Sequence, residues 1–234
     1  MNLMHRTLLA GVGLVALAAC GTEPAKDKTR STEPRGPQAA IPAPAKKDTV
    51  KGLPGMPPVL DPKDVYAADR PNKLSPVVKD FPSRVYVPNT ESDTVSVIDP
   101  KTYEIVETIP VGRQPQHVVP SWDLKTLWVN NNRGHTLTPI DPKTGKAGKE
   151  VEVHDPYNLY FTPHGKYAVV MASLDRELVF RDPHTMKRIK TEPVTCYGVN
   201  HADFSLDGRY FIVSCEFSGE LLKVDTQTVS YTHL

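Results

Sequence analysis

Three polar residues recur at nearly one spacing and are candidates for a shared binding site. His117, Asn158 and His201 lie 41 and 43 residues apart, and each precedes a Ser or Thr by four residues. Imidazole and amide groups donate and accept hydrogen bonds, and a neutral imidazole is also a metal ligand. Such residues either line a ligand site or only cap strands and bond to loop backbone. The sequence leaves both interpretations open.

Two cysteines, Cys196 and Cys215, flank one predicted hairpin. Cys196 lies in the loop that enters the first strand, and Cys215 ends the second strand, which returns antiparallel to the same end. Their Cα atoms are therefore expected near disulfide range. In an oxidising exported compartment we expect a disulfide. Two buried thiols, or a Cys/His metal site that includes His201, are the alternatives.

No strong catalytic motif is found in the sequence. It has no Cys-x-x-Cys-His for c-type haem, no His-Glu-x-x-His, no phosphate loop and no Gly-x-Ser-x-Gly. With Lys+Arg 28 against Asp+Glu 27, the charge balance gives no electrostatic reason to expect nucleic acid as a partner. The sequence therefore predicts no catalytic residue, no metal site and no cofactor.

The elements that position these residues follow from an internal repeat with two markers. One marker is a turn led by Asp, mostly Asp-Pro-x-Thr, and the other is a turn led by Ser or Thr. The first begins at Asp99, Asp141, Asp182 and Asp225, and the second at Ser121, Thr162 and Ser205. The spacings are 42, 41 and 43 residues for the first marker and 41 and 43 for the second. Two markers that share one period make a chance repeat improbable.

Each repeat predicts four short antiparallel strands. In the best-formed unit the first three are residues 200–204, 209–215 and 220–225, with Asp207-Gly208 at a tight hairpin turn. Residues 209–215 are almost continuously apolar and are expected to be buried on both faces. In the earlier units a fourth strand follows the Asp-led turn, at residues 103–110, 147–153 and 186–194. Four antiparallel strands every 40 to 45 residues or so are typical of a β-propeller blade, which predicts an all-β fold.

Part of the first unit resembles the YVTN-type β-propeller repeat. The resemblance rests on Arg-Val-Tyr-Val-Pro-Asn at 84–89, Thr-Val-Ser-Val-Ile-Asp-Pro-Lys-Thr at 94–102 and Thr-Ile-Pro-Val-Gly at 108–112. It extends over residues 83 to 228 and implies kinship with propellers that bind haem d1 and, more distantly, with lactonase-like propellers. Trp122-Asp123-Leu124 and His164 depart from the Pro-Asp-Gly of the family pattern. In a propeller, His117, Asn158 and His201 fall at the entrance of the innermost strand, where side chains can face the central funnel.

Residues 1–19 are typical of a signal peptide. A short basic start precedes the apolar residues 8–19, a run of 12, whereas a spanning helix needs about 20. Leu17-Ala18-Ala19-Cys20 resembles the lipobox of bacterial lipoproteins, in which the Cys thiol receives a diacylglycerol. The resemblance implies an extracytoplasmic protein that is lipid-anchored to a bacterial membrane through Cys20. An ordinary secretory signal with a chance cysteine is the alternative.

The rest of the chain divides into three regions. Residues 20–58 are expected to be a disordered linker, because 21–58 hold eight prolines and few large apolar residues. Residues 59–82 are either an irregular lead-in or a strand at the propeller's outer edge. Residues 83–234 hold the repeats.

The repeats predict fourteen strands, about three and a half blades, with three strands in the first and last units. Residues 229–234 do not match the expected fourth strand of the last unit. A closed propeller needs at least four blades, so we expect a truncated ring whose residues 230–234 are not native. Closure by oligomerisation is the alternative, although an open strand edge promotes aggregation.

The function expected from these observations is a non-enzymatic, membrane-anchored extracytoplasmic module that binds a protein, a polymer or a small ligand. The first alternative is a redox propeller that binds haem d1, with His201 or His117 as the axial ligand. A lactonase-like hydrolase ranks lowest, because it needs several carboxylates around a metal ion and Asp203 is the one inner candidate.

Overall fold

The computed structural model describes residues 61, 63–67, 73–163 and 165–234. The predicted signal peptide, Cys20, the linker and His164 lie outside the described residues. The described part contains strands and turns but no helix, and hence no helix long and apolar enough to span a membrane.

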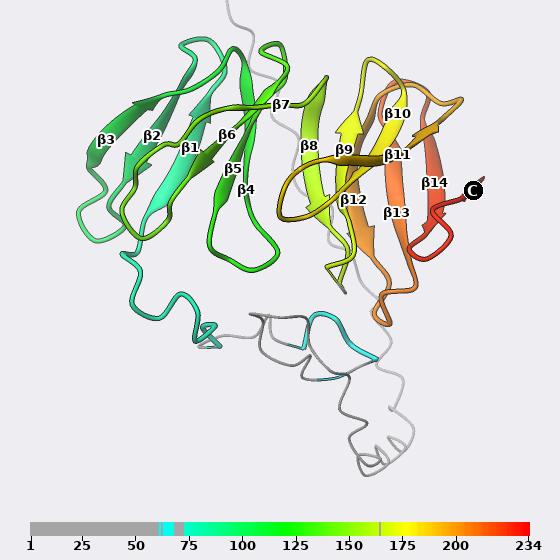
Figure 1. The fold of residues 1–234 in the computed structure, drawn as a ribbon, viewed down its shortest axis with the longest axis horizontal. Coiled ribbons are helices and arrows are strands. Elements are labelled where there is room, and N and C mark those ends of the chain that lie inside the picture. The colour runs from blue at the N-terminus through cyan, green and yellow to red at the C-terminus, as the bar shows by residue number, and fades with distance from the viewer. Residues whose placement is uncertain (1–60, 62, 68–72, 164) are drawn as a thin grey trace, which may run out of the picture. The chain divides into compact units, whose positions relative to one another are not determined.

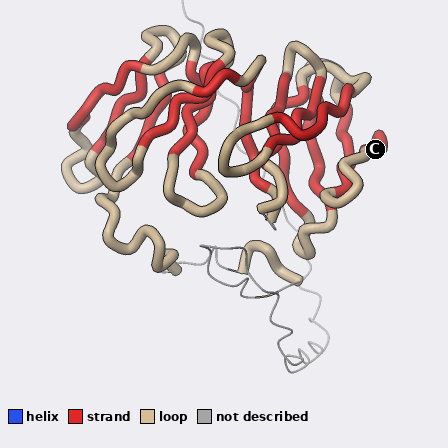
Figure 2. The backbone as a smooth tube through the Cα atoms, in the orientation of Figure 1, coloured by secondary structure: helices blue, strands red, loops and turns tan. Residues whose placement is uncertain are grey.

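Fifteen strands in the described part form four antiparallel sheets, which we call blades 1 to 4 (Figures 1 and 2). Each sheet pairs its strands in chain order, and the predicted all-β fold of propeller blades is confirmed. Blade 1 comprises β1 (Val85–Asn89), β2 (Thr94–Ile98) and β3 (Ile105–Pro110), and blade 2 comprises β4 (Pro115–Pro120), β5 (Leu127–Asn131), β6 (Thr136–Ile140) and β7 (Val151–Glu152). Blade 3 comprises β8 (Pro156–Phe161), β9 (Ala168–Ala172), β10 (Glu177–Arg181) and β11 (Arg188–Pro193), and blade 4 comprises β12 (Val199–Phe204), β13 (Tyr210–Cys215), β14 (Glu220–Asp225) and β15 (Tyr231–His233).

The turns repeat as regularly as the strands. Every described residue with a positive φ lies at one of four equivalent turn positions. These are Leu124, Gly165 and Gly208; Asp93, His135, Arg176 and Gly219; Tyr103, Gly145, Met186 and Val229; and Gln114, Asp155 and Gly198. Nine of them are not glycine, although residues other than glycine rarely have a positive φ. The repeated hydrogen bonds of the blades therefore stabilise this backbone conformation at these positions.

The Asp-led turns show how one side chain closes each of these loops. Asp182 Oδ1 accepts hydrogen bonds from the backbone N–H groups of Thr185 at 2.7 Å and His184 at 3.0 Å. The N–H group of Thr185 is the main reason why the pKa of the Asp182 carboxyl lies below its usual value. Asp141 and Asp225 accept the same pattern of bonds, and the backbone N–H groups of Lys143 and Thr228, respectively, are the main reason why their pKa values are lowered. The marker Asp is therefore a turn-forming residue.

The hydrophobic core lies between neighbouring blades. In blade 1, β1 corresponds by its position in the repeat to β5 and β9, the second strands of blades 2 and 3. These three strands contact the first strand of the next blade, through the pairs β1 and β4, β5 and β8, and β9 and β12. Between blades 3 and 4, for example, Phe180 and Leu178 pack in one cluster with Phe211 and Val213, and all four are fully buried. Burying one such side chain contributes roughly 1.5 to 3 kcal/mol, so each interface between blades stabilises both partners.

Two predictions about the last unit are wrong. Residues 231–233 do form a fourth strand, because β15 pairs with β14 in the register Val224 to Tyr231. In β13, Phe211, Val213 and Cys215 are buried, but the alternate residues Tyr210, Ile212 and Ser214 are only partly buried. The second face of β13 is only partly buried because no further blade covers it in the described part of the chain.

The predicted lead-in is irregular where the structure describes it. Residues 63–67 form turns, and the N–H group of Val65 donates to the carbonyl of Leu206 at 2.7 Å. Tyr66 Oη bonds the Asp203 carboxylate, and the N–H group of Phe204 donates to Tyr66 Oη at 2.9 Å. The lead-in therefore binds blade 4 where the inner strand β12 ends.

Candidate functional site

A β-bulge near the start of each inner strand aims the predicted site residues. In β4, Pro115 pairs with Asn131 and His117 with Asn130, so one extra residue is accommodated between them. β8 has the same irregularity before Asn158, and β12 has it between Val199 and Ala202, where His201 lies. A bulge bends its strand and redirects a side chain away from the regular alternation. The equivalence predicted from spacing thus corresponds to an equivalent backbone irregularity.

The structure brings His117, Asn158 and His201 together, and we call them the inner cluster. The ring centroids of His117 and His201 lie 5.4 Å apart, edge to face. Tyr157 approaches both rings, with centroid distances of 5.5 Å to His117 and 6.1 Å to His201. Asn158 Nδ2 lies 3.3 Å from His201 Nδ1 and donates to Tyr160 Oη at 3.0 Å. Three consecutive blades therefore contribute to one polar and aromatic surface.

Hydrogen bonding defines the tautomer of His201. Asn158 Oδ1 accepts from the N–H group of Leu159 at 2.8 Å, which assigns the amide nitrogen to the side that faces His201. Because this NH₂ group can only donate, His201 Nδ1 is an acceptor and the proton of the neutral ring resides on Nε2. His201 is exposed, so it presents an N–H donor at the surface of the inner cluster.

The second imidazole differs from the first in burial. His117 Nε2 is buried and has no hydrogen-bond partner among the described residues. Burial lowers the pKa of His117, and the neighbouring His201 lowers it further. Burial also raises the pKa of Tyr160, and the charge of Asp203 adds to that rise. The inner cluster therefore contains an imidazole whose burial disfavours its charged form, and a buried nitrogen that has no hydrogen-bond partner among the described residues.

Loops at the entry end, where the inner strands begin, carry three further groups of residues. We define a tip cluster as the turn residues of two neighbouring blades together with the loop that joins the blades. The first, between blades 1 and 2, lines a hollow of about 450 Å³ with Thr90, Glu91, Asp93, Arg113, Gln114 and Arg133. No sequence motif pointed to these residues. The usable signal is positional, because they lie at equivalent points of the repeat.

The second tip cluster joins blades 2 and 3. His135 and His154 stack with ring centroids 4.2 Å apart, and His154 Nδ1 lies 2.5 Å from Asp175 Oδ2. Buried Asp155 accepts from Asn132 Nδ2 at 2.7 Å and from the N–H groups of Leu174 and Asp175 at 2.6 and 3.0 Å. The Asp155 carboxylate therefore links the turns of two blades.

The third tip cluster, between blades 3 and 4, is apolar and aromatic. Leu174, Tyr197 and Phe217 are each more than half exposed, and the guanidinium of Arg176 lies 4.9 Å from the Tyr197 ring centroid. A disulfide joins Cys196 and Cys215 beside it, with a Cα to Cα distance of 6.0 Å. His201 is not bonded to either sulfur, because both are engaged with each other.

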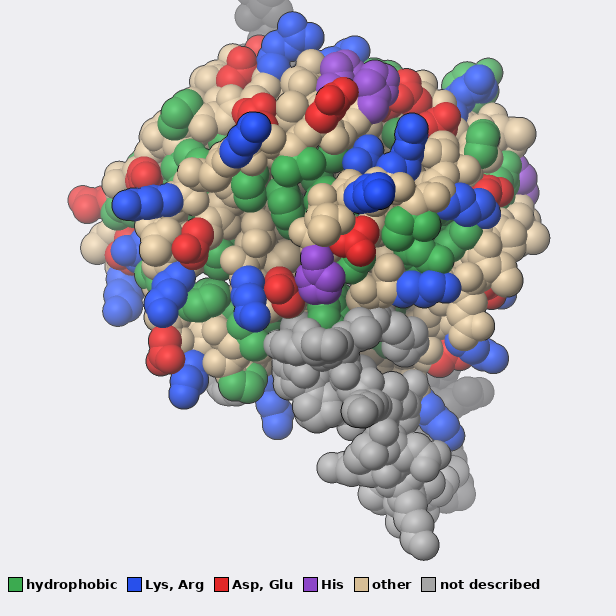
Figure 3. Space-filling model, in the orientation of Figure 1, with side chains coloured by type: hydrophobic (Ala, Val, Ile, Leu, Met, Phe, Trp, Pro, Cys, Tyr) green, Lys and Arg blue, Asp and Glu red, His purple; other side chains and the backbone are tan. Residues whose placement is uncertain are grey.

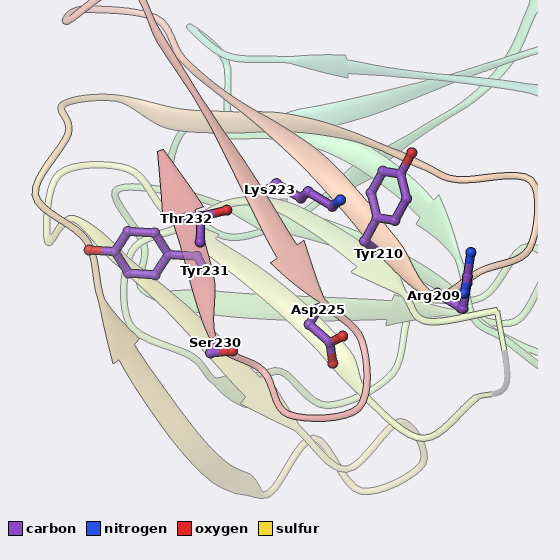
Figure 4. Close-up of a pocket in the computed structure, with 7 residues that line it drawn as sticks. All are labelled: Arg209, Tyr210, Lys223, Asp225, Ser230, Tyr231 and Thr232. Carbon is purple, nitrogen blue, oxygen red and sulfur yellow. The ribbon is translucent and has the colours of Figure 1, made fainter. Parts of the chain in front are cut away.

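Another hollow of about 450 Å³ lies on the outward face of blade 4 (Figure 4). It is lined by Arg209, Tyr210, Lys223, Asp225, Ser230, Tyr231 and Thr232, and Lys223 Nζ lies 4.2 Å from the Tyr210 ring centroid. The residue equivalent to Lys223 in blade 3 is Phe180, which is buried against blade 4. This hollow therefore lies on a face that packs against the next blade elsewhere in the repeat, and we assign no ligand to it.

Charged side chains of both signs are interspersed over the face shown in Figure 3, without a large patch of either sign. Within the described part of the chain, no group of three or more His, Cys, Asp and Glu side chains is arranged to hold a metal ion. The Asp203 carboxylate, the inner acidic residue singled out by the sequence, is bonded to Tyr66.

Residues 71–182 match the model of the YNCE-like beta-propeller family. No curated protein matches the chain in sequence. Among solved structures, hydrazine synthase of Kuenenia stuttgartiensis is similar with a TM-score of 0.56 and 20% identity, over 67% of this chain and 50% of that one. The dihydro-heme d1 dehydrogenase NirN in complex with DHE is similar with a TM-score of 0.53 and 17% identity, over 67% of this chain and 35% of that one.

At these identities the similarity shows the fold alone, and this chain spans half or less of each of the two structures. The predicted resemblance to propeller repeats, including those of haem d1 proteins, is confirmed at that level. Residues 71–182 are therefore similar in sequence to the YNCE-like beta-propeller family, and the described part of the chain has the fold of β-propeller blades.

Proposed function

We propose that this chain is a lipid-anchored extracytoplasmic binding module whose inner cluster takes a neutral, polyhydroxylated ligand such as a stretch of glycan. The anchor rests on the resemblance of residues 17–20 to a lipobox, with Cys20 as the site of lipidation. The observation that carries the binding site is the convergence of His117, Asn158 and His201 around a buried, unpaired His117 Nε2.

The chemistry of the inner cluster favours an uncharged ligand. His201 Nε2 donates, Tyr160 Oη can donate and accept, and the rings of Tyr157 and the two histidines offer apolar faces. Sugar hydroxyl groups donate and accept, while the C–H faces of a sugar pack against aromatic rings. An unpaired buried nitrogen is a rare feature that a ligand hydroxyl or a water molecule would satisfy.

A haem d1 cofactor does not fit His201 as its axial ligand. A metal-bound imidazole donates from its other ring nitrogen to an acceptor. His201 Nδ1 instead faces the Asn158 NH₂ group, which is itself a donor. His117 is enclosed edge to face by the rings of His201 and Tyr157, which occupy the space that a flat macrocycle would need. We therefore propose no redox step.

The test is a binding titration of the full chain with chitotriose, an uncharged oligosaccharide, followed by NMR of the histidine side chains. We expect the His117 and His201 signals to shift and His201→Ala to weaken binding at least about tenfold, since it removes one or more hydrogen bonds. The thermal midpoint of His201→Ala should change little, because the side chain is exposed. His184→Ala, at an exposed turn, is the matched control and should bind normally.

Two results would contradict the proposal. One is the absence of any histidine shift at millimolar chitotriose. The other is a large fall in the midpoint of His201→Ala with binding intact, which would show that the inner cluster serves only to satisfy loop backbone.

A further inference from the structure

The first tip cluster has charges that the fold does not use. Within the described part of the chain, the guanidinium groups of Arg113 and Arg133 and the carboxylate of Glu91 form no ion pair and no hydrogen bond. All three side chains are exposed and line the same hollow of about 450 Å³. The ordinary role of a surface charge, pairing with a neighbour, does not account for them.

A fourth charge in this hollow is committed to the scaffold. Asp93 Oδ1 accepts from the backbone N–H group of Gln114 at 2.7 Å, which fixes the loop before β4 against the turn of blade 1. The side-chain oxygen of Gln114, Oε1, is buried and has no partner among the described residues. Gln114 also lines the hollow, so it supplies an acceptor that lacks a donor.

The loops that carry the two arginines are in close contact and cannot easily separate. The N–H group of Gly134 donates to the carbonyl of Arg113 at 2.9 Å, and that of Asn132 donates to the carbonyl of Gln114 at 3.0 Å. A Cβ atom on Gly134 would lie 2.8 Å from the backbone nitrogen of Arg113, so only glycine fits there. Ligand binding in this hollow would order little backbone, which lowers its cost.

We propose that the first tip cluster binds a small zwitterion, either a free amino acid or a short peptide. Guanidinium groups bind carboxylates through paired, charge-assisted hydrogen bonds, so Arg113 and Arg133 would hold the carboxylate. The ammonium group would donate to the exposed Glu91 carboxylate. The hollow lies within the usual range of ligand sites, about 300 to 1,000 Å³.

The first tip cluster has two positively and two negatively charged side chains, and this balance favours a zwitterionic ligand. A ligand with only negative charge would meet Glu91 and Asp93, and one with only positive charge would meet the two arginines. A ligand with one charge of each sign has a counterpart for both. The site shares no residue with the inner cluster, so either can fail without the other.

The experiment is calorimetric titration of the full chain with three probes. They are the dipeptide Ala-Ala, N-acetyl-Ala-Ala, which lacks the ammonium group, and Ala-Ala amide, which lacks the carboxylate. We expect Ala-Ala to bind and each capped form to bind at least about tenfold more weakly, because a charge-assisted hydrogen bond is lost. Arg113→Gln and Arg133→Gln should each weaken Ala-Ala binding by a similar factor. Neither substitution should change the binding of Ala-Ala amide, because this probe lacks the carboxylate.

The matched control is Arg176→Gln, which removes a guanidinium at the same end of the propeller but in the third tip cluster. It should bind Ala-Ala as the unmodified chain does. The thermal midpoints of Arg113→Gln and Arg133→Gln should match that of the unmodified chain, since neither side chain forms a hydrogen bond or ion pair in the described part of the chain. No heat of binding with Ala-Ala at millimolar concentration, or equal binding of all three probes, would overturn the proposal.

Discussion

The first and third tip clusters share a backbone and differ in almost every side chain. In both, the N–H group that follows the second strand bonds the carbonyl of the loop residue with positive φ, from Asn132 to Gln114 and from Glu216 to Gly198, at 3.0 Å each. Arg113 in the first corresponds to Tyr197 in the third, and Arg133 to Phe217. The difference shows that the repeat conserves the geometry of its turns while the turn tips are free to vary. Binding chemistry can therefore differ from blade to blade on one scaffold.

The largest expected effect comes from the covalent bond that only the third cluster has. Replacing Cys196 and Cys215 together by Ala opens a loop with a sequence separation of 19 and should lower the free energy of unfolding by about 3 kcal/mol. Denaturant unfolding measures the change, and a reducing agent should destabilise the unmodified chain but not the double variant. Ala-Ala binding at the first cluster should stay normal. Loss of that binding would show that the two clusters are not independent.

The next largest effect concerns the second tip cluster, which joins blades 2 and 3 and so follows the first tip cluster and precedes the third along the chain. Asp155→Asn keeps a side chain that tolerates positive φ but has one acceptor oxygen, whereas Asp155 uses two, one for Asn132 Nδ2 and one for the N–H groups of Leu174 and Asp175. We expect a loss of about 2 kcal/mol in the free energy of unfolding, because a buried donor is left without an acceptor. Asp175→Asn, at a more exposed carboxylate, is the control and should cost less. Equal losses would mean that Asp155 does not link the blades.

The smallest expected effect concerns the inner cluster, in which blade 2 contributes His117 and blade 3 contributes Asn158 at the equivalent position. Because burial lowers the pKa of His117, the folded state takes up its proton less readily than the unfolded chain does. The stability that His117 contributes is complete above the unfolded pKa of about 6.5 and is lost as the pH falls toward the lowered folded pKa. His117→Asn should therefore show a smaller drop in thermal midpoint between pH 8 and pH 5 than the unmodified chain. An exposed control, His184→Asn, should show the full drop.

Much of the fold could be predicted from the sequence because turns have local chemistry. Each Asp-led turn depends on one carboxylate and the N–H groups two and three residues later. The spacing of these turns along the sequence therefore predicts the blades. The equivalence of His117, Asn158 and His201 followed from the same count. Such features need no knowledge of distant contacts.

Other features depend on neighbours that the repeat pattern does not contain. Residues 231–233 form a strand of only three residues, and β15 forms because β14 offers it an edge to pair with. The almost continuous apolar sequence of β13 predicts burial of both its faces. How far its second face is buried depends on whether another blade packs beside it. The charges of the first tip cluster come from separate turns and share no motif, so only the fold brings Arg113 and Arg133 to one hollow.

The contact of the lead-in with blade 4 has a consequence for access by large molecules. Val65 and Tyr66 bind at Leu206 and Phe204, where β12 ends, whereas the tip clusters and the inner cluster lie where the inner strands begin. The chain therefore joins the propeller at the end opposite to its candidate binding surfaces. If the protein is held at a surface through its N-terminal side, the end that carries the tip clusters and the inner cluster faces away from the attachment. Long polymers or bulky partners can then reach these clusters without passing the attached end.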